Sequence, residues 1–445
     1  MTRSRLQSSL RTSVFTGVLA AVSGVAFAQE QPAPSATQEP APATPINPDL
    51  APAELTPPQP DVVTTPAPTV AVTAEPDAQK ETAPEAEPED APWYANFKIG
   101  GYVDAYGAIR SDKNSRPTFG GTPVPIGGYY SEAYTQANGF ALAFAGLDAT
   151  YSGDKFGATI NLRFGPGMNR FFGSDVTSFG IQNITQAFVT YKPVDMLTFD
   201  LGQFGTIYGA EVLESWKNIN YTRGALYYAM QPFWHTGLRA NIALHESFAI
   251  NAMVVNGVNN AFENNKTPSL GLQAVFKAGD MFAVSAGYLG ALNPRDGNDP
   301  FGAFQNFFDV VATFKKDGFT LIANFDANLY KNKGSEDGQS FWGISVAPAY
   351  SFCNEFGVGL RFEHLRDSAN QWGMSSNKAG DTADKAYLTT LTATLDIKPV
   401  PNVSALILRP EFRYEVANNY YFYNRDKELS KGFWTLVLGA VVTSL

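Results

Sequence analysis

Residues 404–415 read SALILRPEFRYE, and the charges in this run fall on every second residue. The even-numbered positions are one parity and hold the apolar residues Leu406, Leu408, Phe412 and Tyr414. The odd-numbered positions are the other parity and hold the charged residues Arg409, Glu411, Arg413 and Glu415. Because the side chains of a β-strand point alternately to its two faces, this run predicts a strand with one apolar and one charged face.

The same sorting recurs along the chain. It is found in residues 156–164, 319–330 and 356–364, where polar side chains such as Asn161, Asp326 and Arg361 oppose an apolar face. Strands of a water-soluble sandwich also alternate, so the pattern by itself allows two environments. The lengths of the connections between strands distinguish a water-soluble sandwich from a membrane barrel.

Sixteen such runs can be marked, and the links between them alternate between short and long. The runs begin near residues 97, 139, 156, 181, 197, 235, 248, 269, 281, 305, 319, 339, 356, 386, 404 and 433. Short turns such as 192–196 alternate with long loops such as 111–138 and 204–234. An even number of strands with short turns at one rim and long loops at the other is typical of outer-membrane barrels. We therefore predict an all-β transmembrane antiparallel barrel of about 16 strands over 93–445, with both chain ends in the periplasm.

The first 28 residues have the features of a secretory signal. Arg3, Arg5 and Arg11 precede a short apolar stretch, and Ala26-Phe27-Ala28 is the small-x-small pattern of a cleavage site. The signal predicts export.

Residues 29–92 differ sharply in composition. They hold 16 of the 29 prolines, no aromatic residue, and 12 acidic residues against Lys80 alone. Such a segment cannot bury apolar surface, so we expect a disordered periplasmic tether, either a plain spacer or a contact to the cell wall. Without this segment and the three signal arginines, residues 93–445 carry a net charge of −2 rather than the −10 of the whole chain.

Several other classes of protein are disfavoured. After the signal no run of 18 apolar residues could form a spanning helix. Cys353 is the only cysteine, and no spacing of histidines, cysteines and carboxylates indicates a metal, a cofactor or a catalytic site. No basic patch indicates nucleic acid. We expect a protein that is not an enzyme.

Aromatic residues fall near the predicted strand ends on the apolar parity, as interfacial girdles require. They include Tyr151, Tyr191, Trp234, Tyr288, Phe319, Trp342, Tyr350, Tyr387 and Tyr414. Outer-membrane lipids are therefore the expected surroundings of the apolar face.

Sixteen strands enclose a lumen too wide for their own side chains to fill. This predicts passive diffusion of small hydrophilic solutes or ions, with the long 204–234 connection as a constriction. Expected pore-lining or constriction residues are Asp104, Arg163, Glu211, Glu214, Lys217, Arg223, His235, Arg239, Asp326, Arg361, Glu363, Arg409, Glu411 and Arg413. Opposed loop acids and wall arginines would set up a transverse field. The alternatives are that the loop charges are merely solvated outside and that His235 only hydrogen-bonds the loop.

A different class of function is also compatible with the sequence. The barrel could be a non-conducting anchor for the tether, with an incidental lumen. A homotrimer is a further expectation, because sixteen-stranded barrels of this kind commonly trimerise.

The residues around the long connection resemble a known family. The segments are Asp200-Leu201-Gly202-Gln203-Phe204-Gly205-Thr206, Gly209-Ala210-Glu211, Asn220-Tyr221-Thr222-Arg223-Gly224 and His235-Thr236-Gly237-Leu238-Arg239, with Asn256-Gly257 after the next strand. Together they are similar to the OmpL-like beta-barrel porin-2 family, although Thr222 stands where the family pattern has Ser. The resemblance extends more loosely over 97–445. It implies an outer-membrane barrel of porin type, and it says nothing about the solute.

Overall fold

The computed structural model describes residues 93–111, 118–119, 122–123, 138–166, 168, 181–263, 267–291, 304–331, 339–368, 386–400, 405–424, 426 and 428–444. The signal peptide expected over 1–28 and the tether expected over 29–92 lie outside these residues, as does most of the loop expected over 111–138.

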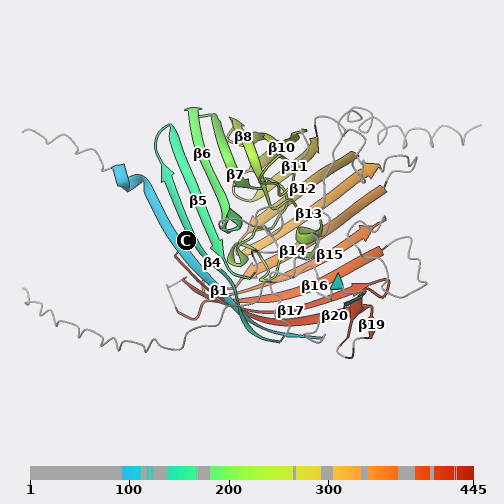
Figure 1. The fold of residues 1–445 in the computed structure, drawn as a ribbon. Helices are drawn as coiled ribbons and strands as arrows, with labels where there is room; N and C mark the ends of the chain where they lie inside the picture. Colours follow the sequence, from blue (N-terminus) through green and yellow to red (C-terminus); the bar gives the residue numbers. More distant parts are fainter. Residues whose placement is uncertain are drawn as a thin grey trace, which may run out of the picture. The chain divides into compact units, whose positions relative to one another are not determined.

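Sixteen strands close into one antiparallel barrel, which confirms the predicted fold class and strand number (Figure 1). Each barrel strand pairs with its neighbours along the chain, and β1 closes the ring by pairing with β20. The strands are β1 (Phe97–Arg110), β4 (Asn138–Ser152), β5 (Phe156–Phe164), β6 (Ile184–Val194), β7 (Leu197–Gly205), β8 (Trp234–His245), β9 (Phe248–Val255), β10 (Ser269–Ala278), β11 (Phe282–Ala291), β12 (Phe304–Lys316), β13 (Phe319–Lys331), β14 (Gln339–Ser351), β15 (Phe356–Asp367), β16 (Ala386–Ile397), β17 (Leu406–Ala417) and β20 (Gly432–Thr443).

Short elements lie between the barrel strands. Two small hairpins pair β2 (Thr118–Phe119) with β3 (Thr122–Pro123) and β18 (Phe422–Tyr423) with β19 (Leu429–Ser430). The helical pieces are η1 (Trp93–Asn96), η3 (Ile181–Asn183), η4 (Ser215–Lys217) and α3 (Ala225–Ala229). No helix in the described part of the chain is both long and apolar enough to cross a membrane.

One predicted strand start needs correction. The sequence pattern begins a strand near residue 181, but β6 begins at Ile184 because Ile181–Asn183 form a 3₁₀ turn. The side-chain amide of Asn183 donates a 2.7 Å hydrogen bond to the Arg163 carbonyl on β5. That bond holds the turn against the neighbouring strand.

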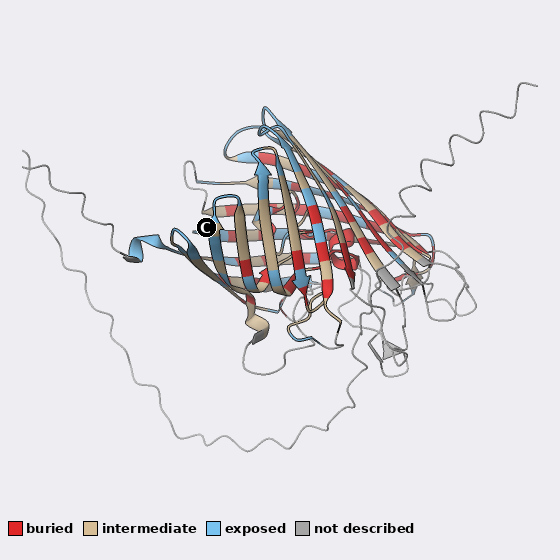
Figure 2. Cartoon of the chain, turned by 90° about the horizontal axis from the view of Figure 1, so that it is seen from above, coloured by how far each residue is buried: buried red, intermediate tan, exposed pale blue. Residues whose placement is uncertain are grey.

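The alternation predicted for the opening sequence is present in β17. Arg409, Arg413 and Glu415 are at most 1% exposed, whereas Phe412 is 45% and Tyr414 38% exposed. Figure 2 shows the same change of burial from residue to residue along other strands. The charged parity therefore faces the lumen and the apolar parity faces outward, as a barrel in lipid requires.

The short turns and the described ends of the barrel lie at one rim. Asp317 and Gly318, which join β12 to β13, have φ values of 48° and 80°. Positive φ at both central residues is the type I′ geometry of a tight hairpin, which glycine adopts without strain. At the same rim Ser444 N–H donates to the Gly101 carbonyl, so the last strand ends beside the start of the first.

The expected aromatic girdle holds for several residues and fails for one. Tyr191, Tyr350 and Tyr414 are between 38% and 45% exposed on the outer face. Trp234 is only 2% exposed and lines a cavity together with residues of the 206–233 connection. Its assignment to the girdle is therefore wrong.

Candidate functional site

The connection between β7 and β8, residues 206–233, is here called the inner loop. Figure 1 shows it within the ring of strands, with α3 toward the β14 and β15 wall. Every residue from 220 to 232 is buried. Of the four charged side chains of the loop, Arg223 is buried, Glu211 and Glu214 are half-buried and Lys217 is exposed.

One clamp joins the start of the inner loop to β5. Arg163 is fully buried, and its Nε and Nη2 donate to Oε1 of Glu214 at 3.1 and 2.6 Å. The same guanidinium pairs with Asp148 on β4. Burial raises the pKa of Glu214, but Arg163 and Lys217 oppose it more strongly, so that pKa lies below its usual range. Glu214 is therefore ionised at neutral pH.

A second clamp holds the loop on the opposite side, at β15. Arg361 Nη1 donates to Glu211 Oε1 at 2.6 Å and to the Thr222 carbonyl at 2.7 Å. Burial raises the pKa of Glu211 and outweighs the lowering by Arg361. Glu363 shares Arg361 and also accepts the backbone N–H groups of Ala225 and Leu226 at 3.0 Å each. It thus satisfies two donors that the first turn of α3 leaves without helical partners.

The charged face of β17 binds the middle of the loop. Arg409 donates to the carbonyls of Ser215, Asn218 and Ile219 at 2.5 to 3.0 Å, and its Nε contacts Asp396 on β16. Glu411 accepts the backbone N–H groups of Tyr221 and Thr222. The lumen charges of the opening sequence therefore hold backbone groups that would otherwise be buried without partners.

Arg413 continues this row. It pairs with Glu415 on its own strand and donates to the Arg223 carbonyl at 2.6 Å. Arg223 is itself fully buried, with its guanidinium 5.5 Å from the centre of the Phe144 ring. Both arginines belong to the loop–wall contact.

Strands on the remaining sides also bind the loop. Asp104 on β1 accepts hydrogen bonds from Ser215 Oγ at 2.7 Å and from Tyr221 Oη at 2.6 Å. Across the lumen, Asp309 on β12 and Asn324 on β13 accept the N–H groups of Gly209 and Ala210 at 3.1 Å each. The predicted lumen residue Asp326 is buried on β13 and accepts from the Asn324 amide at 2.9 Å.

Glycines in the wall make room for the large side chains of the loop. A Cβ on Gly439 of β20 would lie 2.3 Å from the Tyr221 ring. A Cβ on Gly287 of β11 would lie 2.6 Å from the Tyr208 ring. Tyr208 also donates a 2.6 Å hydrogen bond to the Tyr288 carbonyl. These close approaches require residues without a side chain.

The inner loop leaves part of the wall partly accessible. Arg239 on β8 pairs with Asp200 on β7 at 2.7 Å, and these side chains are 20% and 12% exposed. Asn241 donates to Asn251 at 2.7 Å, and Asn251 donates to Gln273 at 2.8 Å, which forms a row of amides across β8, β9 and β10. Lys217 is an exposed residue of the inner loop.

The structure thus brings most of the predicted residues together. Glu211, Glu214, Arg163, Arg361, Glu363, Arg409, Glu411, Arg413, Arg223 and Asp104 all take part in the contact between loop and wall. His235 is fully buried, and its two ring nitrogens contact Thr206 Oγ1 and the Gly257 carbonyl. This is the alternative in which His235 only forms hydrogen bonds with the loop. Lys217 and Arg239 lie outside the main clamps.

Gln273 on β10 donates a hydrogen bond to the Ile207 carbonyl of the inner loop. Sequence reasoning did not single out Gln273, Asp309 or Asn324 as partners of the loop, nor the pockets that Gly287 and Gly439 provide. Their parity places them on the lumen face. Nothing in the local pattern says which of many lumen residues meets the loop, because that depends on how the loop crosses the barrel.

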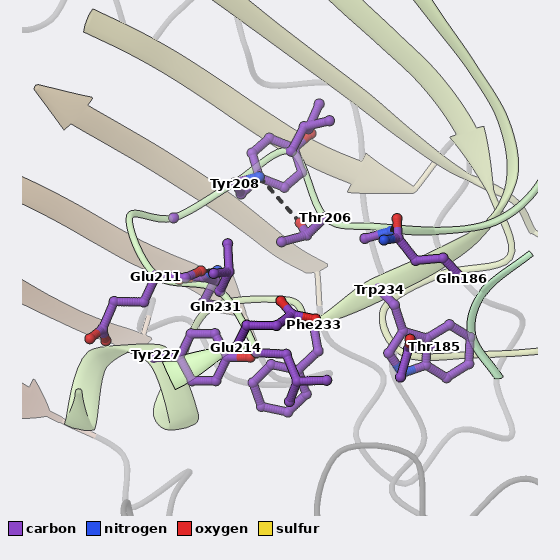
Figure 3. Close-up of a pocket in the computed structure, with 15 residues that line it drawn as sticks. Thr185, Gln186, Thr206, Tyr208, Glu211, Glu214, Tyr227, Gln231, Phe233 and Trp234 are labelled. Carbon is purple, nitrogen blue, oxygen red and sulfur yellow. Dashed lines mark hydrogen bonds between the residues drawn. The ribbon is translucent and has the colours of Figure 1, made fainter. Parts of the chain in front are cut away.

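A cavity of about 170 Å³ lies between the two limbs of the inner loop and β6. Figure 3 shows Thr206 and Tyr208 on one limb, Tyr227 and Phe233 on the other, and Gln186 of β6. Val212, another lining residue, is 44% exposed, so the cavity reaches solvent.

A family model described as "Putative beta-barrel porin-2, OmpL-like" matches residues 96–443. No curated protein matches the chain. Among solved structures, OmpT of Vibrio cholerae aligns with a TM-score of 0.50 at 16% identity, over 78% of this chain and 97% of that one. The outer membrane channel DcaP of Acinetobacter baumannii gives 0.49 at 14% identity, over 78% and 96%. An anion-selective porin from Comamonas acidovorans gives 0.47 at 12% identity, over 78% and 99%. At 16% identity the likeness to OmpT shows the barrel fold alone.

Proposed function

This chain belongs to the OmpL-like beta-barrel porin-2 family, and from that premise we propose that its lumen lets small hydrophilic solutes and ions diffuse passively, with the inner loop as the constriction. The family is one of outer-membrane barrels of porin type and not of enzymes. The observation that carries the proposal is the position of the loop. It lies inside the lumen and is bound from β5 on one side and β15 on the other.

The proposed path runs along the wall that the clamps do not occupy. There the side chains of Arg239, Asn241 and Asn251 keep partial exposure. A polar, partly wetted wall lets hydrated solutes pass, whereas an apolar one would favour dewetting. Lys217 on the loop and the Arg239–Asp200 pair are the charges expected to act on a passing ion.

The second candidate is a non-conducting barrel that anchors the 29–92 segment. The observation in its favour is the continuous burial of residues 220–232, because a loop packed so closely fills much of the lumen. On this proposal the segment reaches the cell wall or another envelope layer.

Planar bilayers distinguish the two candidates. The mature chain, from residue 29 onward, should give stepwise conductance, and so should a variant lacking 29–92. Silent bilayers from protein that is folded, as judged by heat-dependent gel mobility, would contradict the channel and favour the anchor.

The orientation and assembly are further proposals. We infer that the rim carrying the short turns, where Ser444 meets Gly101, faces the periplasm. Protease added outside intact cells should then cut the loops of the opposite rim and spare this one. The homotrimer remains an expectation, which light scattering of the purified barrel tests.

A further inference from the structure

We propose that the cavity within the inner loop is a binding site for small organic ammonium ions, which enter the barrel and pause there. The inference rests on the proposed function, because the solute must reach the loop from an aqueous lumen. It adds a preferred class of solute to a channel that would otherwise be described by size alone.

The charged groups of the lining all have one sign. Glu211 and Glu214 are among the lining residues, and none of the fifteen is Lys, Arg or His. The Glu211 side chain is 16% exposed and the Glu214 side chain 13% exposed. A cavity with two carboxylates and no basic side chain favours a positively charged solute.

Arginines outside the lining pair with these carboxylates. Arg163 is shared between Glu214 and Asp148, and Arg361 is shared between Glu211 and Glu363. Lys217 also acts on Glu214 and Arg413 on Glu211, so the preference for a cation comes from the groups that line the cavity rather than from the net charge around it. Both Arg163 hydrogen bonds to Glu214 go to Oε1, so neither occupies Oε2. An ammonium N–H could donate to that oxygen, and a charge-assisted bond of this kind is about twice as strong as a neutral one.

Aromatic rings form another part of the lining. The Tyr227 and Phe233 rings lie 5.0 Å apart at an angle of 34°, and Tyr208 and Trp234 also line the cavity. The faces of such rings attract cations, more strongly where water is excluded. Figure 3 shows these rings around the same space as Glu214 and Gln231. Carboxylates with aromatic faces suit an ammonium group that carries a short alkyl chain.

The size of the cavity limits the solute. Its volume of about 170 Å³ far exceeds the ~10–15 Å³ that a single water needs, so the cavity has room for a small organic molecule. A primary alkylammonium with four carbons is of this size. We therefore choose n-butylammonium as the probe, with butyramide and butyrate as neutral and anionic probes of similar shape.

The first experiment measures block of the ion current in planar bilayers containing the mature chain. In KCl, butylammonium should halve the current at a concentration at least ~10-fold below that needed with butyramide. Equal potency of butyramide, or stronger block by butyrate, would overturn the ammonium site while leaving the channel intact.

Variants locate the site. Glu214→Gln and Phe233→Leu should each raise the half-blocking concentration of butylammonium by about 3-fold or more. Asp396→Asn is the matched control, because it removes a lumen carboxylate that is 40% exposed and lies outside the cavity lining. Half-block that is unchanged in both cavity variants, or shifted equally by the control, would contradict the assignment.

A silent bilayer would refute the channel without deciding the site. Calorimetric titration of the detergent-folded mature chain with butylammonium then measures binding directly, with Phe233→Leu for comparison. Saturable binding that this variant weakens supports the site. Absence of heat in the unaltered chain overturns it.

Discussion

The guanidinium of Arg361 on β15 lies 2.6 Å from the carboxylate of Glu211 on the inner loop, although 150 residues separate them along the chain. The Arg361 side chain is 1% and the Glu211 side chain 16% exposed. The pair thus fixes the loop to the far wall at a point where water hardly enters. Such a pair sets position more surely than it adds stability, because desolvation offsets much of the attraction.

Loss of this clamp should release the loop. Removing one partner of a buried ion pair costs about 3–5 kcal/mol, so Arg361→Met should lower the temperature at which the barrel unfolds on gels. It should also raise the single-channel conductance. Without Arg361, Glu211 on the loop and Glu363 on β15 lose the cation that holds them together, and the loop can move away from the wall. Arg366→Met is the control on the same strand, since Arg366 lies over the Tyr387 ring on the outer parity. A conductance unchanged by Arg361→Met would mean that the other clamps suffice.

A side chain at Gly439 should displace the inner loop. The Cβ of Gly439→Val would lie 2.3 Å from the Tyr221 ring, so we expect larger and noisier conductance steps. Tyr221→Ala in the same chain should reverse the steric effect. Gly357→Ala is the control, because its Cβ would come no closer than 3.3 Å to its nearest neighbour. Single-channel recordings that do not distinguish the two glycine variants would contradict this packing.

Ion selectivity should respond to the accessible basic residues. Arg239→Ala removes a positive charge beside the proposed path and leaves Asp200 without its ion-pair partner. Lys217→Ala removes an exposed positive charge from the inner loop. Both should raise the ratio of cation to anion permeability, on the order of two-fold. Reversal potentials in a KCl gradient measure this ratio. Arg223→Ala should shift selectivity less, because Arg223 is fully buried; an equal shift would show that the path passes Arg223.

Acid should loosen the Glu214 clamp. Burial raises the pKa of Glu214, but Arg163 and Lys217 lower it to below its ordinary value of 4.5. A carboxyl with a depressed pKa in the folded loop contributes stability above its ordinary pKa, and this contribution is lost as pH falls through the depressed value. Loop fluctuations in the current should therefore increase below pH 4.5. Glu214→Gln should remove that transition, and a transition of the same size in this variant would point to another carboxyl.

The fold was predictable because its signals are local. In β17 the alternation of buried Arg409 and Glu411 with exposed Phe412 can be read from a few consecutive residues. The Asp317–Gly318 pair is of the residue types that favour a tight turn with positive φ. The prediction failed at Ile181, which lies in a 3₁₀ turn rather than a strand, and at Trp234, which is a residue of β8 but is buried in the lining of the cavity. A period-two pattern reports neither a short helical turn nor burial by another segment of the chain.

The sequence by itself determined the closed barrel, its sixteen strands and the face on which each charge lies, because alternation and loop length report directly on lipid and lumen. Only the tertiary structure decided that Arg163, Arg361 and Arg409 hold the inner loop rather than face open water. The reason is physical: the partners of these arginines lie 51, 150 and 191 residues away, and they come within hydrogen-bonding distance only because the ring closes and the inner loop folds into its lumen. The cavity between Glu214 and Phe233 arises in the same way, from two limbs of one loop that meet only inside the barrel.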